Sequence, residues 1–189
     1  NTTGAGNVAV GSLALDANTT AADNTAVGYG SLSANTTGTR NTGIGRFALT
    51  ENTTASDNTS VGYGSLEKNT TGANNSALGK GALFANTTGA SNTAVGFGSL
   101  DANTTGGFNV GLGQSALTDN TTGASNVAIG VSALGTNSTA DFNTAVGRDA
   151  LAANTTGHSN VAVGALALDA NTTGLGLTAV GYNAATTMT

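Results

Sequence analysis

Few residues in this chain could do acid–base chemistry. His158 is the only histidine, and ten carboxylates and five basic side chains are spread over 189 residues. A general base must lie within hydrogen-bond reach of the proton it abstracts. His158 lies in a variable part of the sequence, with no nucleophile or carboxylate predictably beside it. We therefore expect a solvated turn residue at this position and no catalysis by the chain.

The acidic residues do not follow a metal-binding or glycosidase pattern. Calcium-binding β-rolls need a Gly-Gly-x-Gly-x-Asp motif every nine residues, and the sequence has none. A glycosidase needs two acids that flank the scissile bond, whereas the acids here are scattered. The absence of cysteine excludes thiol chemistry and a disulfide framework. The sequence thus predicts no metal and no cofactor.

Asparagine, threonine and glycine recur instead at a fixed spacing. The phrase Asn-Thr-Thr-Gly-x-x-Asn-Thr-Ala-Val-Gly-x-x-Ala-Leu-x-Ala returns every 17 residues, eleven times. Counting each repeat from its first Asn, position 1 is always Asn, position 10 always aliphatic and position 11 always Gly. Position 7 is Asn until Leu177, and position 15 is Leu until Ala185. Fixed-period self-similarity of this kind determines the architecture.

The repeat is too short for helical repeats of about 33–47 residues, and it lacks apolar residues at a 3.6-residue spacing. Each copy is expected to form two short extended runs, around positions 8–10 and 13–16, separated by glycine and by Asn-Thr-Thr-Gly turn residues. The sequence therefore predicts an all-β parallel β-solenoid (β-roll) of eleven 17-residue coils. We expect a single repeat domain over 1–189, with a divergent last coil over 171–187, as an excerpt of a longer fibre protein.

In a solenoid each side chain stacks about 4.8 Å from its counterpart in the next coil. We expect Asn at positions 1 and 7 to form hydrogen-bonded ladders at corners, in left-handed backbone conformations. We expect positions 10 and 15 to form two apolar core ribs, and Gly at position 11 to make a bend that a β-carbon would obstruct. The ladders include Asn18, Asn35, Asn52, Asn69, Asn86, Asn24, Asn41, Asn58, Asn75 and Asn92, and the ribs include Val27, Ile44, Val61, Leu32, Leu49, Leu66, Leu83 and Leu100.

Small side chains beside the two ribs bear on assembly. If position 10 faces inward, position 9 faces outward, because successive strand residues alternate. Position 9 is only Ala, Gly or Ser, and position 14 is only Ala or Ser. A neighbouring backbone would demand such small residues, so we favour a contact between copies of the chain at these positions. The alternative is that both positions are tight places within the coil.

Position 12 carries an ordered surface stripe in the early repeats. Aromatic and cationic residues alternate there, and a cation stacked over an aromatic ring gains up to about 1 kcal/mol at an exposed site. The stripe consists of Tyr29, Arg46, Tyr63, Lys80 and Phe97. Either it stabilises the surface and reflects duplication of a two-coil unit, or it is an aromatic stripe for glycans. We favour the first interpretation.

Two segments resemble known families. Asn126 to Ala133 resembles the head repeats of trimeric autotransporter adhesins (YadA-like), and Asn24 to Gly38 is similar to repeats of bacteriophage tail-fibre proteins. The resemblance extends over all eleven repeats. It implies a left-handed β-roll in a homotrimer, located extracellularly at a cell surface or on a virion appendage. The expected function is a structural or adhesive shaft or head of a fibre, with any host-surface glycan or protein bound through other domains.

Other functions receive less support from the sequence. The net charge of −5 argues against nucleic-acid binding, and no apolar run is long enough to predict membrane insertion. Asn-x-Thr at the start of each repeat would be a glycosylation acceptor in a secretory context, unless the Asn is stacked inward. An ice-binding or ice-nucleation-like β-solenoid is the alternative function, because a flat Thr array can order water. Adjacent Thr2 and Thr3 argue against it, since neighbours in a strand face opposite ways.

Overall fold

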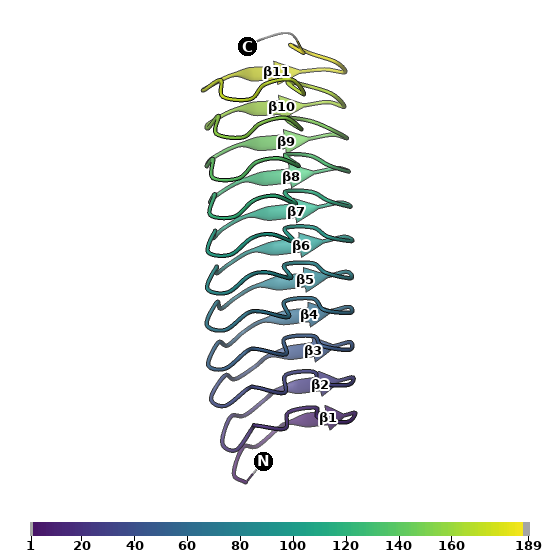
Figure 1. Cartoon of the computed structure of the whole chain (residues 1–189), viewed down its shortest axis with the longest axis vertical. Coiled ribbons are helices and arrows are strands. Elements are labelled where there is room, and N and C mark those ends of the chain that lie inside the picture. Colours follow the sequence, from purple (N-terminus) through teal and green to yellow (C-terminus); the bar gives the residue numbers. More distant parts are fainter. Residues whose placement is uncertain (1, 187–189) are drawn as a thin grey trace.

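The computed structural model describes residues 2–186 as an elongated rod of stacked coils (Figure 1). Eleven three-residue strands form one parallel sheet in sequence order, and the described residues contain no helix. The strands are β1 (Val8–Val10), β2 (Thr25–Val27), β3 (Thr42–Ile44), β4 (Thr59–Val61), β5 (Ser76–Leu78), β6 (Thr93–Val95), β7 (Val110–Leu112), β8 (Val127–Ile129), β9 (Thr144–Val146), β10 (Val161–Val163) and β11 (Thr178–Val180). The predicted parallel β-solenoid is confirmed.

The strands pair in a register of one repeat, so that Ala26 lies opposite Gly43 and Val27 opposite Ile44. Only positions 8–10 are extended, however, and the second predicted run at positions 13–16 is a turn. Leu at position 15 has φ between 49° and 54° in every copy from Leu15 to Leu168. Positions 14 and 15 both point into the core, which a strand would not allow because its side chains alternate. The left-handed residue turns both side chains to the same side.

The core contains the rib at position 15 but not the one at position 10. Leu32, Leu49, Leu66, Leu83 and Leu100 are fully buried, as predicted. The prediction of a core rib at position 10 was wrong. The side chains at this position lie on the outer face of the sheet and are half-buried or exposed. The residues concerned are Val27, Ile44 and Val61.

Position 9 therefore faces inward, and the predicted contact between copies through positions 9 and 14 was wrong as well. Ala94 and Ala128 are completely buried inside their own coil. The reason is space: a β-carbon at Gly43 would lie 2.6 Å from Ser31 Oγ and 3.4 Å from Leu32 Cγ. The Leu rib and position 14 leave room only for the smallest side chains, so the tight-coil alternative explains both columns.

The asparagine ladder at position 1 is confirmed. Asn86 Nδ2 donates to Asn69 Oδ1 at 2.8 Å and to the Gly89 carbonyl at 2.9 Å, while Asn86 Oδ1 accepts from Asn103 Nδ2 at 2.8 Å. The same series of side-chain hydrogen bonds continues without a break from Asn18 to Asn171. Every amide in it is buried and hydrogen-bonded to the next coil, which ties the coils together along the rod.

Asparagine at position 7 forms a second, different ladder. Asn75 Oδ1 accepts the backbone N–H of Asn92 at 2.9 Å, and Asn75 Nδ2 donates to the Gly89 carbonyl at 2.8 Å. The position-4 carbonyl thus accepts from both Asn columns, here Asn75 and Asn86. The prediction of a left-handed backbone at these asparagines was wrong. Positive φ occurs at positions 6, 13 and 15 instead, for example at Asp57 in position 6. The asparagines satisfy buried corner carbonyls through their side chains.

Glycine at position 11 makes the bend at the end of each strand, with φ of 133° at Gly96. A β-carbon there would lie 2.5 Å from the Gly113 carbonyl oxygen, so the predicted obstruction is confirmed. The divergent last coil still forms β11, and Ala185 keeps the left-handed turn with φ of 56°. Thr187, the last residue of that predicted coil, lies outside the described residues.

Candidate functional site

His158 is exposed, as expected for a solvated turn residue. Its Nδ1 lies 3.4 Å from Ser159 Oγ, and both residues are open to solvent. Asp141 occupies the same column one coil earlier, but its Oδ1 accepts the Ala124 N–H at 2.6 Å. Within residues 2–186, no three His, Asp or Glu side chains lie close enough together to hold a metal ion. The structure therefore offers two surfaces, and no polar cluster, as candidate sites.

The first surface is the strand face, defined as the outward side chains of positions 8 and 10 along β1–β11. Position 8 is Thr, Ser or Val, position 10 is Val, Ile or Leu, and neither position carries a charge in any coil. Leu78 is 51% exposed and Ile129 is 38% exposed. At standard strand dimensions the face measures about 10 by 50 Å, or about 500 Å². That area includes the hydroxyl groups of Thr and Ser at position 8, and its aliphatic part at position 10 forms a continuous apolar strip of the kind that often marks an interaction site.

The position-12 stripe forms the predicted cation–π stack. Arg46 Cζ lies 5.7 Å from the ring centre of Tyr29 and 5.8 Å from that of Tyr63. Lys80 Nζ lies 6.0 Å from the Tyr63 ring and 5.6 Å from the Phe97 ring. These distances are within the range in which a ring attracts a cation. The alternation seen in the sequence therefore corresponds to a continuous series of cation–π contacts from Tyr29 to Phe97.

Phe47, at position 13, joins this stack although the sequence argument did not include it. Its ring lies 4.6 Å below the Arg46 guanidinium carbon and meets Tyr29 and Tyr63 edge-on, with ring centres 5.5 and 6.3 Å apart. The residue type at position 13 varies freely from repeat to repeat. The sequence therefore shows no pattern from which a contact between positions 13 and 12 could be predicted.

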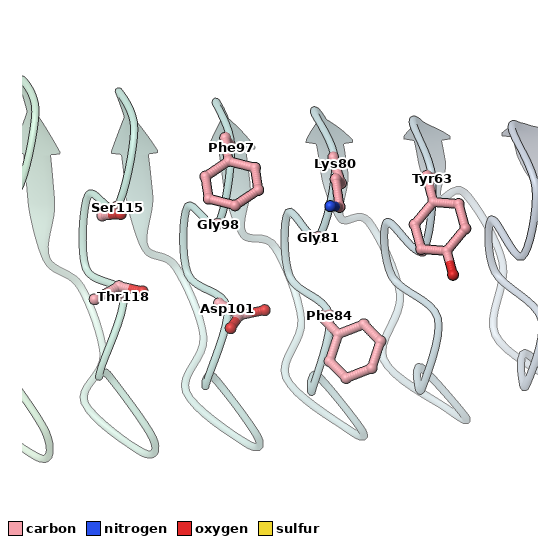
Figure 2. Close-up of a pocket in the computed structure, with 10 residues that line it drawn as sticks. Tyr63, Lys80, Gly81, Phe84, Phe97, Gly98, Asp101, Ser115 and Thr118 are labelled. Carbon is pink, nitrogen blue, oxygen red and sulfur yellow. The ribbon is translucent and has the colours of Figure 1, made fainter.

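The second surface is the aromatic groove, which is lined on one side by the later residues of the stripe. It lies where position 13 is Gly in three consecutive coils, at Gly64, Gly81 and Gly98. It has a volume of about 340 Å³. Figure 2 shows two rows of side chains facing each other across it. One row is Tyr63, Lys80 and Phe97 from position 12, and the other is Phe84, Asp101 and Thr118 from position 16. Sequence reasoning found the first row and missed the second.

The electrostatics of the groove centre on Asp101. Partial burial raises the pKa of its carboxyl group above the ordinary value. Among the described residues no ion pair joins Asp101 to Lys80 or to any other cation. Lys80 faces aromatic rings instead. The groove therefore combines a cation and an acid that leave it without net charge, and the acid keeps free acceptor atoms.

Away from the groove, Arg40 and Asp57 form a two-pronged ion pair at position 6. Arg40 Nε and Nη2 donate to the two Asp57 carboxylate oxygens at 2.6 and 2.8 Å. The hydrogen bonds lower the pKa of Asp57 and raise that of Arg40. Because both side chains are exposed, the pair contributes little to stability.

The Asn-x-Thr sequences that begin at the position-1 asparagines from Asn18 to Asn171 are closed to glycosylation in the folded rod. Position-1 asparagines such as Asn35 and Asn120 are completely buried. Both amide hydrogens of each already have acceptors, one in the neighbouring coil and one in its own coil. A glycan on such an asparagine would break the ladder.

The part of the chain that the structure describes has no helix that could cross a membrane. Comparison of the chain with models of protein families, with curated proteins and with solved structures finds no match.

Proposed function

We propose that this chain is a stiff structural segment of an extracellular fibre and that it assembles as a homotrimer through the strand face. The observation that carries the proposal is the uncharged, largely aliphatic strand face, which continues over all eleven strands. Cross-strand contacts between aliphatic side chains also stabilise the sheet of a lone rod, but they do not require the outer face to be free of charge in every coil. A partner with the same repeat would cover that column in every coil at once.

The size of the strand face fits such an assembly. Burying about 500 Å² per protomer at about 25 cal/mol per Å² corresponds to a gross gain on the order of 10 kcal/mol. Association opposes this with an entropy cost of about 4–15 kcal/mol. Two faces buried together gain roughly 25 kcal/mol gross, which exceeds this cost, so the area supports assembly but does not set the number of copies. Three copies are favoured because the sequence resembles repeats of proteins that form homotrimers.

The fold also suits a passive mechanical role. Eleven coils at about 4.8 Å each extend about 50 Å, and the coils are joined by the strand ladder and two asparagine ladders. Such a rod holds the parts of a fibre at a fixed distance. Contact with a host-surface glycan or protein would then be made mainly by other domains, at a cell surface or on a virion appendage.

The test of assembly uses two substitutions on the strand face, Val95→Lys with Ile129→Lys. Lysines there would place charges into the packed centre of the trimer, yet both side chains already face outward, so the coil itself has no reason to unfold. We expect light scattering to report three chains for the parent and one for the variant, with the β-rich circular dichroism retained. The matched control is Thr88→Lys with Thr122→Lys, which adds the same charge at exposed position 3 and should remain trimeric. A parent that is monomeric at micromolar concentration would contradict the proposal.

One observation favours ice binding as a second candidate. Thr93 and Val95 both lie on the outer side of β6, two residues apart, and Thr with Val or Ile occupies the same two positions in β2, β3, β4, β9 and β11. The argument from adjacent Thr2 and Thr3 concerns a turn, so it does not apply to this flat face. The two candidates use the same surface and are separable. A monomeric parent with thermal hysteresis that Val95→Lys abolishes would favour ice binding over the fibre.

A further inference from the structure

We propose that the aromatic groove is a carbohydrate-binding site for one or two pyranose rings, stacked against the exposed rings of Tyr63 and Phe97 and hydrogen-bonded to Asp101. This inference goes beyond the fibre function and does not rest on it. It assigns a ligand site to this segment itself, at one place along an otherwise repetitive rod.

The groove is a local feature, which the repeat alone would not produce. In the coil before it position 13 is Phe47, whose ring fills the space beside the stripe, and in the coil after it position 13 is Ser115. Between them, a β-carbon at Gly98 would meet no atom within 4 Å, and one at Gly81 only Asp101 Oδ1 at 3.7 Å. The volume of about 340 Å³ lies at the lower end of known ligand pockets, which span about 300–1,000 Å³.

The lining matches the two kinds of surface on a sugar ring. The C–H face of a pyranose is apolar and packs on aromatic rings, and Tyr63 and Phe97 expose 49% and 54% of their surface here. The ring hydroxyls need acceptors and donors at its rim, which Asp101 and Thr118 supply on the opposite wall (Figure 2). The Asp101 carboxylate has no cation to satisfy it among the described residues, so it is free to accept from hydroxyls.

A peptide fits the groove less well. An extended peptide gains affinity by pairing with free backbone groups at a sheet edge, and the three glycine N–H groups along the floor of the groove are already occupied. Gly64 N donates to the Arg46 carbonyl at 3.0 Å, Gly81 N to that of Tyr63 at 3.0 Å and Gly98 N to that of Lys80 at 3.1 Å. Recognition must therefore come from side chains, and the lining has no net charge. These features favour a sugar over an acidic or a basic peptide.

The experiment fills the groove with a residue that the chain already uses at that column. Phe47 has φ of 61° and Gly81 has φ of 67°, and each lies between two aromatic residues of position 12. Gly81→Phe should therefore fold and occupy the groove. Ser132→Phe, at the same column with φ of 55° but outside the groove, is the matched control. Asp101→Ala is a second variant that leaves the groove open and removes the acceptor.

The probes are the methyl glycosides of glucose, galactose, mannose and N-acetylglucosamine, together with lactose and cellobiose, followed by saturation-transfer NMR on the full 189-residue chain. We expect at least one sugar to bind the parent and Ser132→Phe equally, and to bind Gly81→Phe and Asp101→Ala at least tenfold more weakly. Circular dichroism verifies the fold of each variant. No binding of any sugar at 20 mM, or equal binding by a folded Gly81→Phe, would overturn the proposal. Binding of a capped Gly-Arg-Gly peptide in the absence of sugar binding would assign the groove to peptides instead.

Discussion

At the scale of single residues, the unusual feature is the number of side chains held in the left-handed region. Non-glycine residues seldom adopt positive φ, yet Leu100 does so with φ of 54° while completely buried. Its burial in the continuous Leu rib offsets the conformational cost of about 1–2 kcal/mol. The same region is open to exposed residues such as Asp57 and Asn74 at position 6. In this fold the backbone of the coil, rather than residue preference, determines where positive φ occurs.

The ladder at position 1 gives a sharp residue-level prediction. Asn86→Asp removes both amide donors and places a charge between Asn69 Oδ1 and the neighbouring Asn103 in a fully buried column. An uncompensated buried charge of this kind costs about 3–5 kcal/mol. We expect a correspondingly large loss of unfolding free energy in urea titrations. Asn74→Asp makes the same chemical change at an exposed site and should stay within about 0.5 kcal/mol of the parent; equal effects would refute the ladder as a source of stability.

The raised pKa of Asp101 predicts that this carboxyl group changes the stability of the fold with pH in the direction opposite to that of a salt-bridged carboxylate. Because burial raises its folded pKa above the ordinary value of 3.8, the folded state binds more protons than the unfolded state between those two values. Stability from this group is therefore lost as pH rises through that window. Asp101→Asn should raise the melting temperature relative to the parent at pH 7 and lose this advantage at pH 3. Asp119→Asn makes the same chemical change at an exposed acid and serves as the control.

At the scale of the element, each coil is one short strand followed by two tight turns, and the two glycine columns of the coil have different roles. Gly at position 11 ends every strand where the next coil's backbone passes close by. Gly at position 13 occurs only in some coils, and the other coils have Leu, Phe, Ser, Asp or Asn at this position. The first column is required by the coil, and the second shapes the surface.

A pair of substitutions separates these roles. Gly96→Ala would bring a β-carbon to 2.5 Å from the Gly113 carbonyl at φ of 133°, and we expect a cost of about 3 kcal/mol or more. Gly98→Ala meets no atom within 4 Å at φ of 60°, so only the left-handed backbone opposes it, at about 1 kcal/mol. Thermal unfolding followed by circular dichroism would rank the two. A milder effect for Gly96→Ala than for Gly98→Ala would contradict the close approach of the coils.

At the scale of the whole molecule, the rod resembles a one-dimensional stack in which each coil contacts only its neighbours. Register is uniform from β1 to β11, so every outward column is a straight line. That geometry makes the strand face a continuous surface rather than scattered apolar spots. It also makes any contact between parallel copies repeat once per coil.

Assembly through this face predicts a melting temperature that depends on concentration. If the folded rod is stabilised by its partners, mass action makes the melting temperature fall on dilution. We expect the parent to melt several degrees lower at 1 µM than at 100 µM, and the double variant Val95→Lys with Ile129→Lys to melt at one temperature throughout. Concentration-independent melting of the parent would show that the partner contributes nothing to the fold.

The sequence by itself determined the period, the parallel β-solenoid, both asparagine columns, the Leu rib and the glycine bend. These are the features in which each column imposes one strict demand, such as the absent β-carbon at Gly96 or the amide at Asn86. The sequence did not decide which of two adjacent strand residues, Ala94 or Val95, faces inward. Alternation permits both arrangements, and only the packed width of the coil selects between them.

The tertiary structure also decided what the surface presents. Because the turn at positions 13–16 brings Leu100 and its small neighbour into the core together, the space left for position 9 accepts Ala94 and turns Val95 outward. The same turn places position 16 beside position 12, so that Asp101 faces the stripe across the groove (Figure 2). Neither of these two arrangements follows from the spacing of residues along the chain. Both depend on a left-handed backbone, which the residue types at these positions do not predict.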